Sequence, residues 1–432
     1  MSQNYRPSLR QKISRWAYSC LLFLLLPLLI AHFLYRYVSR HPGYSLKRTQ
    51  RFGLGMCTAQ PGGILIHCVS VGEVVAAANM VRALRAKQPA LAITLTTTTA
   101  TGAQRVLDLF GTQVSHCYLP YDLPFMMRRL ISVCRPVHVL ITEVELWPNF
   151  IHHCWRNNIP ISVINARMTK KSARSYAKIG ALFSPMLLKL TAICAQGQRD
   201  FDNYLALGAP RDTLFLTNNI KFAHQPDAQT MDIAAQFAAR FKLEGRPILV
   251  AGSTHEPEES MLLDAYQTLL IHQPNLLLII VPRHPQRFDA VHALCLSSGL
   301  NTVTSSSNIE DTTHMQVLLI DQMGLLQGVY ALTHIAFVGG SIADRGGHNA
   351  LEPAAFGVPV IMGPHTYNNP DICQTLVDAG ALKTVFNAQD IAHQVGHWLD
   401  DKPARTKAGL GAKQVLQNNS GAVDATLKIL QL

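Results

Sequence analysis

The sequence predicts an α/β protein made of two halves of similar size behind an apolar N-terminal segment. Three observations support this. Short β-branched runs alternate with helical patterns, the alternation pauses near residues 224 to 246 before it resumes, and one uncharged stretch lies near the start. Such alternation is typical of βαβ units with a buried parallel sheet. The 432 residues are enough for two or three domains.

The N-terminal segment predicts a membrane anchor. Residues 16–35, WAYSCLLFLLLPLLIAHFLY, contain no Asp, Glu, Lys or Arg, although Pro27 and His32 interrupt them. About 20 apolar residues cross a bilayer. A cleaved signal peptide would need small residues after the apolar run, where Arg36 and Arg40 stand instead. We therefore favour a retained anchor in residues 1–45, which either spans the membrane or lies in its interface.

Positive charge is concentrated beside this segment. The formal net charge is +11, and residues 1–51 hold nine Lys or Arg and no Asp or Glu, which leaves +2 for the other 381 residues. Basic residues that flank an apolar segment suit anionic lipid headgroups. A nucleic-acid binder would carry its charge across the body of the protein. We therefore expect contact with membrane lipids and no nucleic-acid partner.

The first half is expected over residues 46–225. Its strand-like runs are short, apolar and rich in β-branched residues, and helical patterns follow several of them. The strand-like runs are residues 62–69, 91–99, 137–145, 161–167 and 190–196, and the helical patterns are residues 73–87, 100–110 and 146–158.

Residues 226–246 are expected to form a linker that contains one helix, and the second half is expected over residues 247–432. This half repeats the same plan. Its strand-like runs are residues 247–253, 275–284, 316–321, 334–341 and 358–364, and its helical patterns are residues 258–270 and 286–296.

Cysteine and acidic residues give no sign of a metal site. The nine cysteines are scattered without a C-x-x-C pair, which argues against a disulfide framework or a zinc site. Asp200 and Asp202 open a helical pattern, where acidic residues suit the helix dipole, so we interpret them as structural. We expect chemistry without a metal or a cofactor.

Three charged residues follow predicted strands of the first half: Glu73 after Ser-Val-Gly, Glu143 in ITEVELWPN, and Lys221 in NNIKF. Ligands of such sheets bind beyond the carboxyl ends of the strands. Glu73 is either a first-turn glutamate favoured by the helix dipole or a general base. The second interpretation requires burial to raise its pKa against the effect of the helix N-terminus.

The second half carries glycines, hydroxyls and one arginine at the equivalent strand ends. Helix N-termini bind anions through free N–H groups, and the planar guanidinium of Arg283 can hold a phosphate. This half therefore predicts a site for a phosphate-bearing nucleotide. Each feature also has a structural interpretation: the glycines can serve turns, Asn349 can cap a helix, and Glu352 can suit a helix dipole.

Motifs in the expected order resemble those of the 3-deoxy-D-manno-oct-2-ulosonic acid (Kdo) transferases of lipopolysaccharide assembly. The resemblance runs from about residue 45 to about residue 400. The motifs are SVGEV, TTTTATG, YLPYDLP, ITEVELWPN, INARMTKKSARSY, NNIKF, STHEPEE, VPRHPQRF, DQMG, FVGGSIADRGGHNALEP and MGPHTYNN.

The resemblance implies a GT-B glycosyltransferase, with two Rossmann-like domains, a cleft between them and an N-terminal membrane helix. Such enzymes move Kdo from CMP-Kdo to a lipid A precursor (lipid IVA), invert the anomeric configuration and need no metal. The first half would face the acceptor, and the second would bind the nucleotide sugar. The resemblance also implies location at the inner membrane, with the catalytic domains on the cytoplasmic side.

The resemblance also implies roles for residues. Glu73 matches the family's general base, and Glu143 and Lys221 match residues assigned to transition-state stabilisation. The positions that match CMP-binding residues are Pro282, Arg283, Met323, Gly324, Leu325, Asn349, Ala350, Leu351 and Glu352.

Two positions depart from the family pattern. Leu325 stands where the family usually has a glutamate, so it can contribute only backbone polar contacts to a nucleotide. Asn218 stands where the family more often has a glycine. The alternatives are another membrane-associated GT-B sugar transferase, a nucleotide-sugar epimerase, or a membrane-tethered nucleotide-binding protein without catalysis. An epimerase has no use for the membrane segment.

Overall fold

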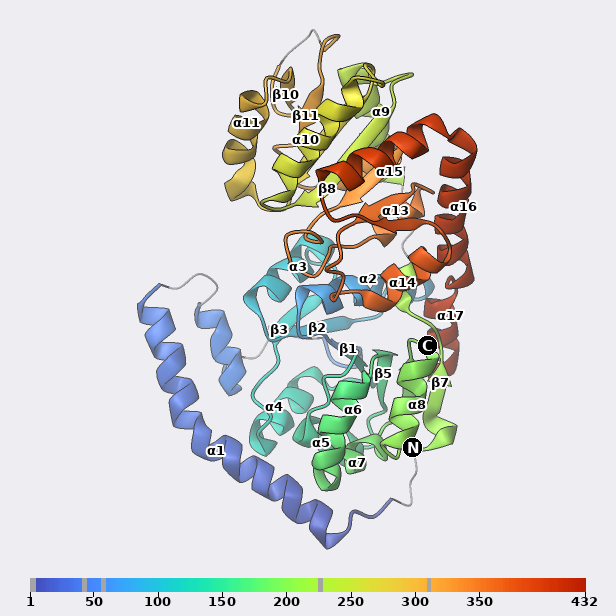
Figure 1. The fold of residues 1–432 in the computed structure, drawn as a ribbon. Helices are drawn as coiled ribbons and strands as arrows, with labels where there is room; N and C mark the ends of the chain where they lie inside the picture. Colours follow the sequence, from blue (N-terminus) through green and yellow to red (C-terminus); the bar gives the residue numbers. More distant parts are fainter. Residues whose placement is uncertain (1–4, 41–44, 56–59, 224–227, 309–311) are drawn as a thin grey trace. The chain divides into compact units, whose positions relative to one another are not determined.

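The computed structural model describes residues 5–40, 45–55, 60–223, 228–308 and 312–432 (Figure 1). The chain forms two compact units. The first comprises Met1–Ala223 and Asn419–Leu432, and the second comprises His224–Asn418. The α/β architecture predicted from the alternating pattern is confirmed in each unit.

The first unit contains a seven-stranded parallel sheet in the order β3-β2-β1-β4-β5-β6-β7. The strands are β1 (Ile64–His67), β2 (Ile93–Thr97), β3 (Ser115–Tyr118), β4 (His138–Thr142), β5 (Ile161–Ala166), β6 (Ala192–Ala195) and β7 (Leu214–Leu216). The helices are α1 (Leu9–Val38), α2 (Val71–Lys87), α3 (Ala100–Phe110), α4 (Pro124–Cys134), α5 (Pro148–Arg156), α6 (Lys170–Lys178), α7 (Gly180–Leu187), α8 (Gln198–Ala206) and α17 (Ala422–Leu430), with short 3-10 helices η1 (Leu46–Phe52), η2 (Arg211–Thr213) and η3 (Ile220–Ala223).

The sheet of the first unit is covered on both faces, which explains why its central strands are continuous apolar runs. Side chains alternate along β1, so Leu65 joins one core cluster and Ile64 and Ile66 join the other. Helices α4, α5 and α7 contribute to the first cluster, and α2, α3 and α17 contribute to the second. The strand order reverses between β1 and β4, which makes the carboxyl ends of these two strands the topological switch point.

The second unit contains another seven-stranded parallel sheet, in the order β10-β11-β9-β8-β12-β13-β14. The strands are β8 (Ile248–Thr254), β9 (Leu277–Pro282), β10 (Thr302–Thr304), β11 (Val317–Leu319), β12 (Ile335–Val338), β13 (Val360–Met362) and β14 (Leu382–Thr384). The helices are α9 (Ala228–Phe241), α10 (Glu258–Leu270), α11 (Phe288–Ser297), α12 (Leu326–Ala331), α13 (Leu351–Ala355), α14 (Pro370–Asp378), α15 (Ala388–Asp400) and α16 (Lys402–Asn418), with the 3-10 helix η4 (Pro285–Arg287).

The predicted linker at residues 226–246 needs correction. Its helix, α9, belongs to the second unit, because Phe237 and Phe241 are buried in a core cluster with residues of β8 and β9. Phe237 and Phe241 are four residues apart, so they lie on the same face of α9, and this face is the buried one.

The predicted C-terminal boundary also needs correction, because the second unit ends at Asn418 rather than at residue 432. Helix α17 returns to the first unit. Val423, Leu427 and Leu430 are buried in the same core cluster as Ile64 and Ile66 of β1. The last helix therefore completes the core of the first unit from the other end of the chain.

Helix α1 is a single 30-residue helix that continues through Pro27 and begins with a capping box at Ser8. It is long and apolar enough to cross a membrane. Ser19 and Phe33 are buried, and Leu22 and Leu26 pack against the core cluster under α4, α5 and α7. The opposite side exposes large apolar residues, among them Trp16, Phe23, Leu24, Leu28 and Leu34.

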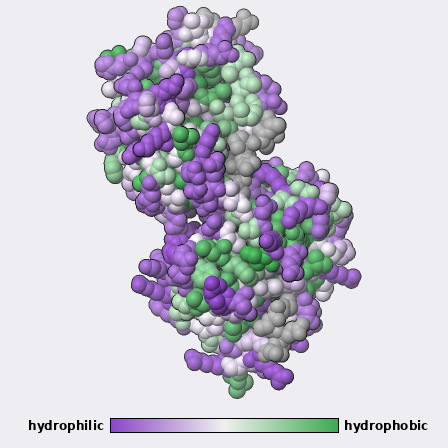
Figure 2. Space-filling view, turned by 90° about the vertical axis from the view of Figure 1, so that its right-hand side faces the viewer, coloured by the Kyte–Doolittle hydropathy of each residue, from purple (hydrophilic) through white to green (hydrophobic). Residues whose placement is uncertain are grey.

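The face of the molecule shown in Figure 2 has a different character. Hydrophilic residues are spread over both units there and surround smaller hydrophobic areas. Many of the exposed large apolar side chains of the described residues belong to α1, whereas those of other elements stand singly in the sequence.

Candidate active site

Glu73 lies at the switch point of the first sheet, in the first turn of α2 after β1. Its side chain is 9% exposed. The backbone N–H of Val69 donates to Oε2 at 2.8 Å, and the hydroxyl of Ser70 donates to Oε1 at 3.3 Å. The chain between strand and helix therefore turns around the carboxylate and fixes its position.

Glu143 and Lys221 lie beside Glu73 and form an ion pair. Glu143 follows β4, the neighbour of β1, and its Oε1 lies 3.0 Å from Nζ of Lys221 in η3. The Glu143 backbone is in the left-handed region, with φ of 62°. A non-glycine residue in that region marks a constrained position, common at functional sites. The structure thus brings together the three residues that the sequence analysis proposed for catalysis.

The pKa of Glu73 is raised to about 7, mainly by burial and also by the negative charges of Glu143 and Glu145, against the lowering effect of the Val69 and Ser70 hydrogen bonds. Burial likewise raises the pKa of Glu145, and the charge of Glu143 adds to this effect. Burial therefore opposes the helix N-terminus at Glu73, as the general-base interpretation requires. A carboxylate with a pKa near neutrality can accept a proton at physiological pH.

The sequence analysis missed the residues that position η3 and Glu143. The side-chain Oδ1 of buried Asn165, near the end of β5, accepts the backbone N–H of Ile220 at 3.1 Å, which anchors the segment that carries Lys221. The hydroxyl of Tyr204 donates to the backbone carbonyl of Glu143 at 3.4 Å. In the sequence, only the position of Asn165 near the end of the predicted strand ISVINAR indicates that its side chain could lie near the site.

Asn218, one of the two departures from the family pattern, lies just before η3 with φ of 63°. Glycine adopts this left-handed conformation freely, and asparagine tolerates it better than most residues. The left-handed conformation accounts for the glycine that the family more often has at this position, and asparagine can adopt it too.

In the second unit, the predicted nucleotide-binding residues follow three strands of one sheet, β9, its neighbour β11, and β12, which β8 separates from β9. Pro282 ends β9 and Arg283 follows it, Met323, Gly324 and Leu325 follow β11, and residues 349–352 follow β12. All three segments therefore lie at the carboxyl edge of one sheet, where ligands of such sheets bind. Arg283 lies close enough to His348 for its charge to lower the pKa of that imidazole.

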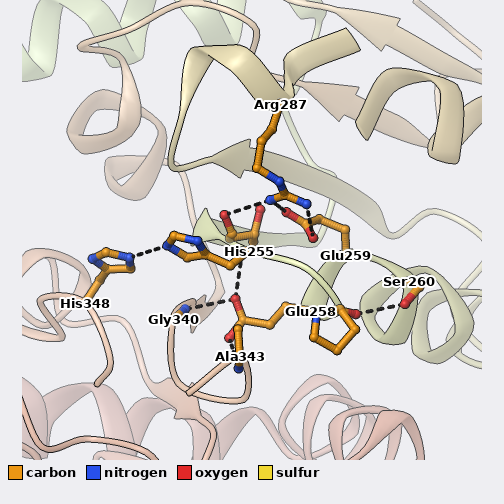
Figure 3. Close-up of polar contacts among 10 residues, drawn as sticks. His255, Glu258, Glu259, Ser260, Arg287, Gly340, Ala343 and His348 are labelled. Carbon is orange, nitrogen blue, oxygen red and sulfur yellow. Dashed lines mark hydrogen bonds and ion pairs between the residues drawn. The ribbon is translucent and has the colours of Figure 1, made fainter. Parts of the chain in front are cut away.

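A buried carboxylate holds the glycine-rich loop after β12 (Figure 3). Glu258, at the start of α10, is fully buried and accepts five backbone N–H groups: those of His255, Gly340, Ser341, Ile342 and Ala343, at 2.9 to 3.3 Å. A Cβ on Gly339 would lie 2.4 Å from the Ser253 carbonyl oxygen. The loop thus fits only with glycine at 339 and an acceptor at 258.

Three histidines gather beside this loop. Nε2 of His255 lies 2.9 Å from Nε2 of His348, so one ring donates and the other accepts. The His284 ring packs edge-on against His255 with centroids 5.3 Å apart. Burial lowers the pKa of His348 to about 4, assisted by the charge of Arg283, so this imidazole is neutral at physiological pH. The three histidines therefore connect the Pro-Arg-His segment (residues 282–284) to the Gly-Gly-His-Asn segment (residues 346–349).

A second buried acid, Glu259, forms a bidentate ion pair with Arg287 at 2.6 and 3.1 Å, also visible in Figure 3. The pair ties the start of α10 to η4 and so fixes the chain on either side of His255 and His284. Glu258 and Glu259 belong to the STHEPEE motif, yet nothing in their sequence positions distinguishes these buried roles from those of ordinary first-turn acids.

The start of the helix in GGHNALEP differs from the prediction. Helix α13 begins at Leu351 and has only five residues. Asn349 Oδ1 accepts the N–H of Leu351 at 3.2 Å, and Asn349 Nδ2 lies 3.4 Å from Glu352 Oε1. The N-cap residue is Ala350, so Asn349 accepts the first N–H of the helix from one position earlier and is not its cap. So short a helix also has a weak dipole.

Leu325 packs its partly buried side chain against the core cluster that contains Phe237 and Phe241. The Leu325 side chain therefore helps to cover the apolar core of the second unit. Neighbouring Met323 is 59% exposed, and Gly324 has φ of 88°.

Acidic residues outside these sites have structural partners. Asp200 is buried and its Oδ1 accepts the backbone N–H of Met168 at 2.6 Å. Within the described residues, no group of three or more His, Cys, Asp or Glu side chains has an arrangement that could hold a metal ion. Chemistry without a metal stays a prediction.

Comparisons with known proteins agree on one family. A family model described as 3-Deoxy-D-manno-octulosonic-acid transferase (kdotransferase) matches residues 47–224, and one described as Glycosyl transferases group 1 matches residues 248–415. A 3-deoxy-D-manno-octulosonic acid transferase from Haemophilus influenzae is 39% identical over 96% of this chain and 98% of its own. The enzyme of that name from Bordetella pertussis is 33% identical over 85% of this chain and 86% of its own.

Solved structures show the same fold at low sequence identity. A UDP-GlcNAc 2-epimerase from Neisseria meningitidis bound to UDP-GlcNAc is 16% identical, covers 85% of this chain and 99% of its own, and gives a TM-score of 0.59. The predicted GT-B fold class is therefore confirmed, and the fold alone does not separate transferase from epimerase chemistry.

Proposed function

Since this chain belongs to the 3-deoxy-D-manno-octulosonic acid transferase family and is a glycosyltransferase, we propose that it transfers Kdo from CMP-Kdo to a lipid A precursor, with Glu73 as general base. The observation that supports this most directly is the surroundings of Glu73. A buried carboxylate with a pKa of about 7 stands at the switch point beside the Glu143–Lys221 ion pair.

In the proposed reaction, the acceptor hydroxyl oxygen attacks the anomeric carbon of Kdo, and the hydroxyl proton passes to the Glu73 carboxylate. The bond from that carbon to the CMP phosphate oxygen breaks, and CMP leaves with its electron pair. Attack opposite the leaving group inverts the anomeric configuration. Glu143 and Lys221 supply a fixed negative and a fixed positive charge near the centre where charge develops. No step requires a metal ion.

We propose that the second unit binds the CMP moiety at the carboxyl edge of its sheet. Arg283 can hold the phosphate, and the segments at 323–325 and 349–352 can contact the nucleoside. The hydrogen bonds that the backbone N–H groups of the glycine-rich loop donate to the Glu258 carboxylate keep this loop in one conformation. A loop that is already ordered loses less entropy when the nucleotide binds.

We also propose that the protein associates with the inner membrane through α1, with both units on the cytoplasmic side and α1 in the membrane interface. Ser19 and Phe33 are both buried against the first unit. These contacts are about 21 Å apart at 1.5 Å per residue, within an apolar segment that is only about 30 Å long. A helix held along the protein body over most of that length lies on the membrane surface more readily than it crosses the bilayer.

The experiment that tests the reaction is radiolabelled Kdo transfer with purified protein, CMP-Kdo generated in situ and a tetra-acylated lipid A precursor. Glu73→Gln, which preserves size and removes the base, is assayed beside the wild type. We expect the wild type to form a Kdo-lipid and the variant to lose transfer while it still binds CMP. A wild type that binds CMP but transfers no Kdo would instead support a nucleotide-binding protein without catalysis.

A further inference from the structure

A cavity of about 430 Å³ lies where α1 meets α5 and α7. Its lining includes five cationic side chains and no Asp or Glu. The cationic residues are Arg6, Lys12, Arg15, Arg156 and Lys189. Three aromatic side chains, Tyr5, Trp16 and Trp155, also line it. Ligand pockets typically have volumes of roughly 300 to 1,000 Å³, so the cavity is large enough for a small charged group.

Lys189 is the most informative of these residues because it is buried, with 4% of its surface exposed. Its Nζ lies 5.6 Å from the ring centre of Trp155 and 6.0 Å from that of Tyr5. Within the described residues, no carboxylate forms an ion pair with it. Burial lowers the pKa of Lys189 to about 8, and the charge of Arg15 contributes, yet the ammonium stays mainly protonated at neutral pH.

The charges of Arg15 and Arg156 repel each other, and in the part of the chain that the structure describes no carboxylate forms an ion pair with a cation of this cavity. Nη1 of Arg15 donates to the neutral amide oxygen of Asn149 at 3.0 Å. The buried carboxylate of Asp122, which attracts Arg15, accepts the backbone N–H groups of Asn149 and Phe150. Partly buried like charges are unfavourable unless an opposite charge joins them. The arrangement therefore fits an anionic ligand.

The position of the cavity indicates where this anion comes from. Lys12 and Arg15 lie on α1 within about one turn of its apolar segment 16–35, so a helix in the membrane interface would hold both at the level of the lipid headgroups. Lys189 lies just before β6, at the amino edge of the sheet, whereas Glu73 and Glu143 lie at the carboxyl edge. The cavity is therefore distinct from the candidate active site.

We propose that this cavity binds the phosphate headgroup of an anionic phospholipid in the membrane leaflet that contacts α1. The cations neutralise the phosphate, and the tryptophans lie at the interface between headgroups and acyl chains, where this residue is favoured. Occupation would orient the first unit on the membrane as well as hold it there. This inference rests on the proposed membrane association and not on the Kdo transfer reaction.

Flotation of the full-length protein with vesicles tests the inference. Three vesicles are compared: phosphatidylcholine alone, phosphatidylcholine with phosphatidylglycerol, and phosphatidylcholine with oleate at the same charge density. The pocket variant Lys12→Gln/Arg156→Gln changes two exposed residues. Its control, Arg82→Gln/Arg105→Gln, removes the same charge from α2 and α3, which cover the other face of the sheet.

We expect the wild type to bind phosphatidylglycerol vesicles more tightly than both other kinds. The pocket variant should lose roughly tenfold in that binding, since two basic residues near an anionic surface are removed, and the control should lose less than about twofold. Lys189→Met, which keeps the aliphatic stem, should reduce the preference without lowering the thermal midpoint. Equal losses in pocket variant and control would overturn the inference, as would equal wild-type binding to phosphatidylglycerol and oleate vesicles.

The result is separable from the proposed function. A wild type that floats with no vesicle would overturn both the membrane association and the headgroup site. The transfer assay in detergent would still report on the reaction by itself.

Discussion

At the scale of single residues, Glu73 and Glu258 show how position changes the role of a first-turn glutamate. Both begin a helix directly after a strand. Glu258 accepts five backbone N–H groups and serves as a fixed structural anion. Glu73 accepts one backbone N–H and one hydroxyl, and burial together with two neighbouring glutamates raises its pKa to about 7. The difference lies in the number of donors, which the sequence does not reveal.

The raised pKa of Glu73 predicts a pH dependence for transfer. A general base acts when deprotonated, so kcat/KM should fall about tenfold per pH unit below pH ~7 and level off above it. Glu73→Gln should lose about 10²- to 10⁴-fold in rate and abolish this limb. A pH–rate profile with the acceptor well below its KM, where the rate reports kcat/KM, measures both.

Glu145→Gln serves as the matched variant for that experiment. The negative charge of Glu145 raises the pKa of Glu73, so its removal should move the acidic limb to lower pH while turnover persists. A limb that stays unchanged when Glu73 is replaced would show that another group titrates.

Glu258→Gln should destabilise the second unit. The amide presents an NH₂ group to backbone donors that now share a carboxylate, and buried donors without acceptors cost about 1 to 3 kcal/mol each. We expect a loss of about 2 to 4 kcal/mol in the free energy of unfolding, measured by urea denaturation, and weaker CMP binding. The exposed neighbour Glu256→Gln is the control and should change stability by less than about 0.5 kcal/mol.

At the scale of secondary-structure elements, the sequence predicted the central strands and missed the edges. The four strands without a predicted counterpart are β3, β7, β10 and β14, and these are the outermost strands of the two sheets. Each has partly exposed positions, whereas β1, β4 and β9 are buried throughout. An edge strand has a neighbour on one side only, so its residues need not form the continuous apolar run that marks a buried parallel strand.

Helix α17 gives an element-scale prediction. Leu427 is fully buried in the core of the first unit, far along the chain from its partners in β1. Leu427→Ala should reduce the free energy of unfolding of the first unit by about 2 to 5 kcal/mol, because a buried cavity replaces the side chain. Lys428→Ala, on the exposed side of the same helix, is the matched control for urea denaturation. Equal effects of the two substitutions would show that α17 does not belong to this core.

At the scale of the whole molecule, the proposed membrane association depends on the surroundings of α1. Only 11% of the most apolar 18-residue stretch of α1 is buried against the protein. Most of the apolar surface of this helix therefore needs another apolar environment. The buried stripe at Ser19, Leu22, Leu26 and Phe33 nevertheless keeps one side of it against the first unit. Lipid on one side and protein on the other is the environment of an interfacial helix.

This arrangement predicts that both ends of α1 face the cytoplasm. Leu9 and Val38 begin and end the helix, and both are exposed. Each is replaced by cysteine in a Cys20→Ser/Cys57→Ser chain, and inside-out membrane vesicles are treated with an impermeant maleimide. An interfacial helix should be labelled at both positions. Protection of one of the two would show that α1 spans the bilayer.

The sequence by itself determined the α/β class, the central strands, the apolar N-terminal helix and the family, because these depend on local periodicity and on motifs that occur in order. Only the tertiary structure decided that Lys221 pairs with Glu143, that Glu258 holds the glycine-rich loop, and that the last helix returns to the first unit. It also decided that Lys189 is buried beside Arg15 and two aromatic rings. These features depend on burial and on contacts between residues far apart in the chain, which a local pattern cannot encode.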